Sequence, residues 1–447
     1  MKQNLLYLIL LVPFFVFPQN ADSTINKGNL KGQWRTYYMN TFNKGSLKDF
    51  SALATGGTLK YQFKFNNHFE VGAALYNSSN LGIQDLTIAD ATTGRISRYE
   101  EGLFDRLDLS NDVVILLGEL FATYTLPKHE FKLGRMKINT PLVNPEDGRM
   151  IPTLVQGFWY KFKNHSTDLF QVGILNKIAP RSTGNFFGIG ESIGTYAVGR
   201  NRDGRNNQYN GNTHSDFLFL LNSNLKITEN IQINVWNHYV DNIFNSLYVK
   251  SRLALNQKVG LELEWLHQDR VGDGGNVIDS LRYYDQNSAD ILGIKMNYKW
   301  KTSAVSLAYN RILPKGQFIS PREWGREDLF SFQKRERSEG SADNHALVLY
   351  FNTNWLLIKE NADIDMILSL GRHWKPSVLD PVLNKYAVPD YTHLNLDFFF
   401  NIKKLKNLQP ELLITTKIAN GDFPDNPNFY FNKTDMVHVD LIFNYNF

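Results

Sequence analysis

A strict alternation of apolar and polar residues recurs along almost the whole chain and narrows the folds open to it. The stretch LKYQFKF (59–65) alternates four apolar residues with three polar ones, and HFEVGAALY (68–76) alternates again after the turn Asn66–Asn67. The final stretch, HVDLIFNYNF (438–447), stops on Phe447 with the alternation still running. Period two is the side-chain period of a β-strand, and two such runs around a two-residue turn form a hairpin. The chain is predicted to be all-β.

The lengths of the connections between these segments alternate in turn. About eighteen segments begin near residues 29, 54, 68, 114, 130, 152, 167, 214, 230, 244, 258, 288, 303, 343, 361, 391, 409 and 433. Short connections, such as Asn66–Asn67 and Lys301–Thr302, alternate with long polar ones near 79–112, 179–213, 271–287, 314–342 and 375–390. The connection Asp241–Ile243 is an exception, because it is short although it lies at the end of the sheet that carries the long loops. An antiparallel meander with short turns at one end and long loops at the other is typical of an outer-membrane β-barrel.

The apolar face of such a sheet needs a covering, and lipid provides one. In hydrocarbon every backbone N–H and C=O must be paired, which strands achieve only by closing into a barrel. We therefore predict a transmembrane antiparallel β-barrel of about 18 strands, with short periplasmic turns and long extracellular loops, in the outer membrane of a Gram-negative bacterium. Phe447 then faces lipid at the periplasmic rim, where the barrel-assembly machinery would recognise the last strand. The alternative, a secreted β-sandwich or solenoid, has a polar outer face and lacks the rhythm of loop lengths.

The N-terminus predicts export. Lys2 precedes the apolar run Leu5–Phe17, which is too short to span a bilayer and is followed by polar residues. We assign 1–18 to a signal peptide, 19–28 to a short periplasmic segment and 29–447 to the barrel; the alternative is a buried N-terminal strand or helix. After Phe17 no apolar run exceeds the six residues of Ala346–Phe351, whereas a membrane helix needs about 20. The net charge of +4, or about +3 without Lys2, is too small to indicate nucleic-acid binding.

A motif in the first half of the chain resembles the OprD family of outer-membrane porins. The stretch KLGRMKINTPLVNPEDGRMIPTLVQGF (132–158) contains Gly134–Arg135, Thr140–Pro141, Asp147-Gly148-Arg149, Pro152 and Gly157–Phe158, in the order in which that family carries them. The resemblance extends weakly from about residue 29 to the end, and eighteen strands is the family's number. It implies a channel for small solutes bearing carboxylates, which move along basic residues of the wall.

The same resemblance implies a constriction. The third long connection of such porins folds into the lumen, so that residues 139–151 would narrow the pore and Arg135, Asp147 and Arg149 would stand at the narrowing. Two prolines and an Asp/Arg pair suit a rigid loop, although that pair can also simply hold the loop together. Simple alternation puts Arg135 in lipid, so we expect a bulge near Gly134 that returns it to the lumen, with an arginine reaching the rim as the alternative.

The polar face of each strand defines the expected lumen wall. It carries the bases Lys31, Arg35, Lys60, Lys64, Lys250, Arg252, Lys295 and Lys299, and the acids Glu70, Glu119, Glu262, Glu264, Asp365, Asp397 and Asp440. The bases gather on the first two strands and again near the tenth and twelfth. Such segregation favours anionic groups along the basic wall, unless the charges simply pair with one another.

These observations predict a porin for passive, mildly selective diffusion of small anionic or carboxylate-bearing solutes, with lipid and lipopolysaccharide as its surroundings. No catalytic motif is present, the ten histidines show no metal-ligand spacing, and no cofactor is expected. The alternative is a non-conducting or adhesive barrel whose long loops bind a partner. The arginine-rich segment Gly199–Asn212 could then contact lipopolysaccharide phosphates.

Overall fold

The computed structural model describes residues 28–145, 149–164, 169–196, 198–357 and 362–447. The predicted signal peptide, and all of the segment 19–28 except Gly28, lie outside these described residues. Within the described ranges no helix is both long and apolar enough to cross a membrane.

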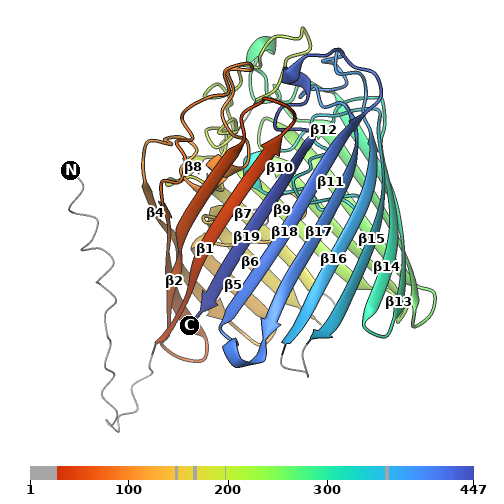
Figure 1. Cartoon of the computed structure of the whole chain (residues 1–447). Coiled ribbons are helices and arrows are strands. Elements are labelled where there is room, and N and C mark those ends of the chain that lie inside the picture. The colour runs from red at the N-terminus through yellow and green to blue at the C-terminus, as the bar shows by residue number, and fades with distance from the viewer. Residues whose placement is uncertain (1–27, 146–148, 165–168, 197, 358–361) are drawn as a thin grey trace.

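The predicted all-β barrel is confirmed: eighteen long strands and one short one make up the described fold (Figure 1). The strands are β1 (Asn29–Asn43), β2 (Phe50–Lys64), β3 (Phe69–Asn80), β4 (Val113–Thr125), β5 (His129–Met136), β6 (Leu154–Lys163), β7 (Leu169–Ala179), β8 (Phe187–Gly188), β9 (Leu218–Lys226), β10 (Ile231–Val240), β11 (Phe244–Ala254), β12 (Val259–Arg270), β13 (Ser288–Trp300), β14 (Ser303–Ile312), β15 (Asn344–Leu357), β16 (Ala362–Trp374), β17 (Asp390–Ile402), β18 (Leu408–Asn420) and β19 (Met436–Asn446). Short 3-10 helices lie in the connections: η1 (Glu100–Leu103), η2 (Asp279–Leu281), η3 (Arg322–Trp324), η4 (Lys403–Leu405) and η5 (Pro427–Phe429).

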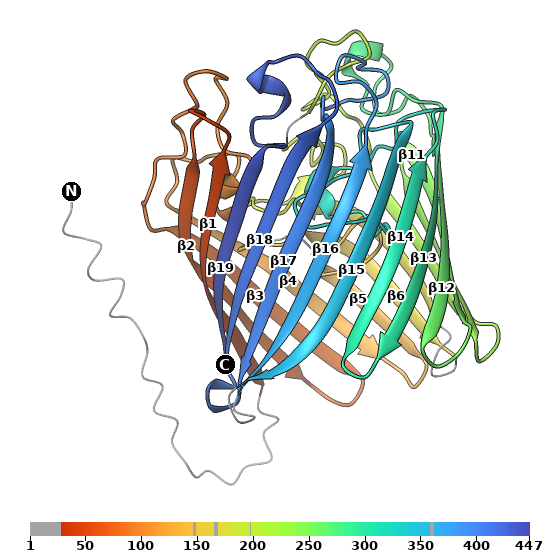
Figure 2. The same cartoon turned by 45° about the vertical axis from the view of Figure 1, so that its right-hand side comes forward.

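The ring closes by antiparallel pairing of its first and last strands. β1 and β19 pair from Gln33↔Asn446 to Asn43↔Met436, and they lie side by side in Figure 2. Below this ladder the backbones of Gly32 and Phe447 exchange two hydrogen bonds, of 2.8 and 3.0 Å. Every other long strand pairs with its neighbours in chain order, and the two-residue β8 adds only to β7. A closed ring leaves no strand edge unpaired in the hydrocarbon.

The outward face of the strands is apolar, as the alternation predicts. On β2, Leu59 and Tyr61 are exposed, whereas Lys60 between them points inward. Aromatic side chains gather where the strands meet the short turns: Tyr298 lies 5.6 Å from Trp300, and Tyr445 lies 6.3 Å from Phe447 between ring centroids. Phe447 itself is 57% exposed. Aromatic rings at this level are favoured at the boundary between hydrocarbon and water.

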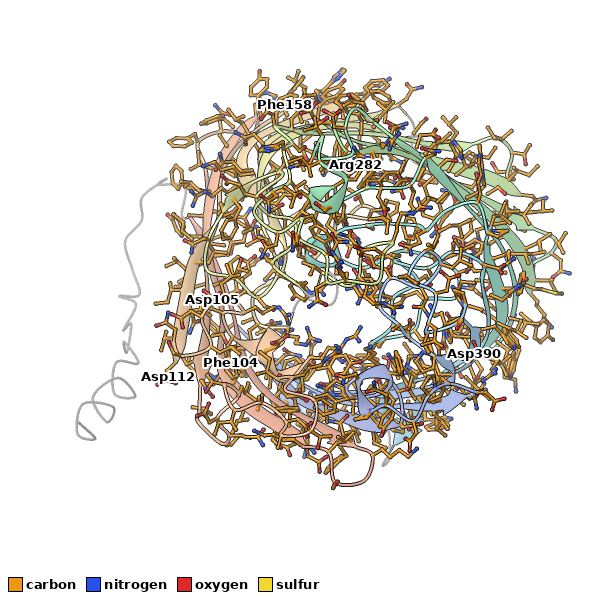
Figure 3. The ribbon with its side chains drawn as sticks, turned by 90° about the horizontal axis from the view of Figure 1, so that it is seen from above. Phe104, Asp105, Asp112, Phe158, Arg282 and Asp390 are labelled. Atoms are coloured by element: carbon orange, nitrogen blue, oxygen red, sulfur yellow. The ribbon has the colours of Figure 1, made fainter. Side chains whose placement is uncertain are left out.

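The long connections at the opposite end pack into the barrel. Trp324 in η3 and Ile193, which follows β8, belong to the same buried apolar cluster as the inward wall residues Trp159, Leu175 and Leu220. Seen from above, the ribbons of several long connections lie within the ring of strands (Figure 3). The extracellular half of the interior is therefore lined by loops as well as by the wall.

Candidate functional site: the barrel interior

The inner wall of β11–β13 carries acids and bases in alternate strands. The register sets Lys250 opposite Glu264, and at the next level sets Arg252 opposite Glu262 and Glu262 opposite Lys295. Glu264 is buried and lies 4.0 Å from Lys250, whereas Glu262 accepts a 2.7 Å hydrogen bond from Asn297. These expected wall residues thus share one face, with the acids between the bases.

The wall of β1–β5 is mainly basic. Lys31 and Lys60 are directly opposite each other, and Lys60 forms a 2.7 Å ion pair with the buried Glu119. Lys132 on β5 shares this face, because its partner Thr123 lies two residues from the inward Phe121 on the same side of β4. The Lys132 ammonium lies 3.6 Å from the centre of the Phe121 ring. Lys137, directly after β5, is another base near Glu119 and Lys60. Alternation could have identified Lys132, since Phe131 and Leu133 on either side of it face outward.

The remaining expected wall residues lie closer to the ends of their strands or higher on the wall. Lys64 lies 3.8 Å from Glu70 near the short turns, and Lys299 is exposed at the corresponding end of β13. Arg35, higher on β1, donates to Asn444 at 2.6 Å and to the backbone oxygen of Arg149.

A segment of the connection between β14 and β15 follows the inner wall around more than half of the ring. We call residues 328–337 the inner belt. At its start Asp328 forms a 2.8 Å ion pair with Lys250 on β11, and the Phe330 N–H donates to Glu264 on β12 at 2.8 Å. Ser331 N–H then donates to Asn310 on β14. Because these interactions are made to successive strands, hydrogen bonds and ion pairs hold the inner belt against the wall along its length.

The second half of the inner belt continues to the seam where the barrel closes. Gln333 bonds Ser369 and His373 on β16 at 2.9 Å each, and Lys334 pairs with Asp397 on β17 at 2.8 Å. Arg335 reaches Asp440 on β19. The acids Asp397 and Asp440, expected on the wall, are therefore each neutralised by a belt cation. Asp365, lower on β16, accepts hydrogen bonds from amide side chains.

The inner belt is not predicted from the sequence, although it is a major element of the interior. Its sequence has neither a period-two pattern nor a known motif, so its path depends on contacts with strands far away in the chain. The mixture of Arg, Lys, Glu and Gln in 333–337 was its one signal within a long connection.

The described parts of the connection 137–153, residues 137–145 and 149–153, are packed in the interior, and the first of them contacts the inner belt. Thr140 and His238 on β10 are joined at 3.0 Å, and the Asp328 N–H donates to the Pro141 carbonyl at 3.0 Å. Asn144 donates to the Arg326 carbonyl at 2.9 Å and accepts from the Arg326 N–H at 3.1 Å. A cavity of about 190 Å³ lies beside this contact, lined by Asn139, Thr140, Pro141, Asn144, Asn234, Trp236, Lys250, Arg326 and Asp328.

Arg149 lies at the far end of this connection, against the wall. Its side chain is 5% exposed, and its guanidinium approaches η1 so closely that a Cβ on Gly102 would be 2.7 Å from one nitrogen. Its charge acts on Glu100 in η1 and on Asp440 in β19. Asp147, its predicted companion, lies outside the described residues. Arg149 therefore joins two long connections to the seam of the barrel.

The prediction of a bulge at Gly134 is wrong, and the Arg135 side chain does not point into the lumen. The β4–β5 register runs without a shift through Gly134, and Arg135 stands opposite Leu120, which is 52% exposed on the outer face. The guanidinium donates to Gln156 at 3.2 Å and stacks 4.5 Å from the Phe186 ring. Because β5 ends at Met136, Arg135 lies at the extracellular end of its strand. Arg135 therefore lies on the outer face, as simple alternation places it, and not at the constriction.

Among the residues that the structure describes, no group of three or more His, Asp or Glu side chains is arranged to hold a metal ion.

The sequence of the chain matches the model of a known protein family. A family model described as outer membrane porin, OprD family, matches residues 122–339, just under half of the chain and including the motif at 132–158. No curated protein sequence matches the chain. The match to the family model confirms the family resemblance predicted from that motif.

Solved structures extend the likeness to the whole fold. Acinetobacter baumannii OccAB4 is 14% identical, with 94% of this chain and 98% of that chain covered and a TM-score of 0.70. OccAB3 of the same organism is 13% identical over 95% and 100% of the two chains, with a TM-score of 0.71. Pseudomonas aeruginosa OpdK, solved with vanillate, is 12% identical over 94% and 98%, with a TM-score of 0.68. The chain is thus an outer-membrane β-barrel with the fold of the OprD and Occ porins.

Proposed function

We propose that this outer-membrane barrel is a porin through which small solutes diffuse passively, with a mild preference for anionic and carboxylate-bearing ones. The lumen is narrowed where the connection 137–153 meets the inner belt. OpdK, which has the same fold, was solved with vanillate, a small carboxylate, and this supports the choice of solute class.

The balance of charge on the inner wall is the observation that carries the proposal. The acids Glu264, Asp397 and Asp440 are bonded by groups of the inner belt or by Lys250. By contrast, the side chains of Lys31, Lys132 and Lys137 make no hydrogen bond or ion pair within the described ranges. Charges without partners in a narrow water-filled passage attract the opposite charge most strongly.

The preference is mild because some acids also lack a cationic partner. Glu262 is held by the amide of Asn297, and Glu411 by the amide of Asn444 at 2.6 Å. Both carboxylates can repel an anion that approaches them. We therefore expect anions to pass along the β1–β5 side of the lumen, where Lys31, Lys60 and Lys132 lie on β1, β2 and β5 and Lys137 directly follows β5.

Two measurements test this function. Reversal potentials of the refolded protein in planar bilayers under a KCl gradient should show weak anion selectivity, and strong cation selectivity would show that the basic wall does not control passage. Swelling of liposomes in sugars and small carboxylic acids distinguishes a conducting barrel from a plugged or purely adhesive one. Liposomes that do not swell in any of these solutes would contradict the porin assignment.

The proposed narrowing is tested through Asn144. Asn144→Ala removes the bonds to Arg326 that couple the connection 137–153 to the connection carrying the inner belt. We expect a larger or more variable single-channel conductance. Asn139→Ala is a matched control, because Asn139 lines the same cavity but makes no side-chain hydrogen bond within the described part of the chain. Equal conductance of the two variants and the original protein would show that this contact does not form the narrowest part of the pore.

A further inference from the structure

Several extracellular connections meet above the lumen. The Asn432 amide, between β18 and β19, donates to the Ile96 carbonyl, between β3 and β4, at 3.1 Å. Lys433 donates to the carbonyls of Tyr386, Ala387 and Asn428 at 2.9, 3.3 and 3.0 Å, which joins its connection to that between β16 and β17. These bonds bring together parts of the chain that are far apart in sequence.

Arg200 brings a further connection, that between β8 and β9, to the same place. Its guanidinium donates to the carbonyls of Val378 and Asn384 at 2.9 and 2.8 Å, and its backbone N–H donates to the Lys385 carbonyl at 2.9 Å. The Arg200 Nε is buried and has no hydrogen-bond partner. We call Arg95, Arg98, Arg200 and Lys433 the cationic cluster.

The cationic cluster has a large excess of positive charge. The four charges that act most strongly on the Lys433 ammonium are those of Arg95, Arg98, Arg200 and Arg322, all of them positive. Burial together with these charges holds the pKa of Lys433 well below its usual range. Of the four arginines, Arg322 is neutralised by Glu339 at 3.0 Å, and Asp380 acts on Arg200 from a greater distance.

Two arginines of the cluster are free to bind a ligand. The side chains of Arg95 and Arg98 make no hydrogen bond or ion pair with any described residue, and Arg95 is exposed while Arg98 is half-buried against the Tyr99 ring. A guanidinium presents several N–H groups in a fixed plane, which match two oxygens of a phosphate or carboxylate. Like charges gathered in a partly buried site repel each other unless an anion lies between them.

We propose that the cationic cluster is a binding site for a phosphate group at the extracellular mouth of the barrel. The guanidinium groups of Arg95 and Arg98 would donate to its oxygens, and the neighbouring Arg200 guanidinium would contribute positive charge. The phosphate can belong to a soluble ion or ester, or to a phosphorylated lipid headgroup. The site goes beyond the proposed permeation, because equilibrium binding at the mouth does not require that the barrel conducts.

Titration calorimetry of the full chain in detergent micelles tests the site. Inorganic phosphate is titrated in a low-chloride buffer near pH 8 into the original protein and into Arg95→Gln, Arg98→Gln and the double variant. We expect each single substitution to weaken binding by about tenfold, as for the loss of one charged hydrogen bond. Arg202→Gln is the matched control, because Arg202 is exposed on the connection between β8 and β9 and is not among the charges acting most strongly on Lys433.

The source of the phosphate is distinguished by a second titration, with a short-chain phosphatidic acid. Binding of both ligands, weakened in the Arg95 and Arg98 variants, supports a site open to solutes. Binding of the lipid alone, with the same dependence on the variants, supports a headgroup site. If neither ligand binds, or if binding is equally strong in the double variant, the proposal is overturned. Conductance of the same preparation reports separately on the porin function.

Discussion

Arg335 donates hydrogen bonds to Asp440 and, at 3.0 Å, to the Tyr37 hydroxyl, so one guanidinium of the inner belt contacts both strands that close the barrel. Asp440 and Arg335 are almost completely buried. The belt is thus anchored at the seam as well as along the wall, and its far end cannot leave the wall without exposing a buried carboxylate.

The first prediction concerns this anchor. Arg335→Met should lower the free energy of unfolding by about 3–5 kcal/mol, because it removes the cation paired with the buried Asp440 carboxylate and leaves it only the hydrogen bond with His438. The released end of the belt should also increase single-channel conductance. The measurements are the temperature of heat-modifiable migration on gels, and conductance in bilayers.

Lys44→Met is the control for that variant. Lys44 forms a 3.2 Å ion pair with Asp435, but its side chain is 63% exposed on the extracellular side. An exposed pair of this kind contributes little to stability. If the Arg335 and Lys44 variants melt and conduct alike, the belt is not anchored at the seam.

The second prediction concerns ion selectivity. Lys137→Glu replaces an unpaired base by an acid near Glu119 and should shift the reversal potential in a KCl gradient toward cations. Lys128→Glu makes the same change of charge in the turn between β4 and β5, where Lys128 is exposed. A shift in both variants of the same size would indicate a general effect of net charge rather than a basic wall.

The third prediction is a pH dependence that arises from Glu100 in η1. Burial raises the pKa of Glu100 to about 7 from its usual 4.5, and its Oε2 has no hydrogen-bond partner. The charged groups facing it are Arg149, Asp440 and His438, which lies 3.7 Å away. Since its folded pKa is raised, Glu100 contributes most to stability below about pH 4.5, and this contribution is lost as the pH rises to 7 and above.

Glu100→Gln should therefore reduce the loss of thermal stability between pH 5 and pH 8, because the amide stays neutral. The measurement is the temperature of heat-modifiable migration at both pH values. Glu191→Gln, at an exposed carboxylate of the connection between β8 and β9, should leave the pH dependence as it is. An unchanged pH dependence in the Glu100 variant would assign the effect to another group.

The fourth prediction concerns the close approach of β1 and β2. Gly57 has φ +141°, and a Cβ there would lie 1.8 Å from the Gln33 carbonyl oxygen. Gly57→Ala should destabilise the barrel by about 1–3 kcal/mol or more, through strain and displacement of the strand. At Gly260 in β12 the nearest atom is 3.7 Å from an added Cβ, so Gly260→Ala should be tolerated. Equal refolding yields and melting temperatures would contradict this difference.

The strands could be predicted from the sequence because the residue pattern of each strand depends on what its own two faces contact. In β2 or β19 one face meets lipid and the other meets water or polar groups, so period two is visible within a few residues. Arg135 illustrates how reliable this signal is: alternation alone places it outside, and only the added assumption of a bulge moved it to the wrong face.

The interior loops could not be predicted in the same way. The inner belt is held by partners such as Glu264 and Asp440, which lie 66 and 105 positions away from Phe330 and Arg335. No local pattern records such contacts. The motif at 132–158 correctly indicated the family, but it drew attention to Asp147 and Arg149, while the inner belt (328–337) went unnoticed.

The pairing of Gly32 with Phe447 has a consequence for the order of events in biogenesis. The first and last strands complete the ring, so the ring cannot be completed until β19 has been synthesised. Until β19 arrives, β1 has a free edge that would be left without partners in the bilayer. Synthesis of the first strand and closure of the ring must therefore be separate events in time, and the nascent chain has to be kept from pairing with other chains in between.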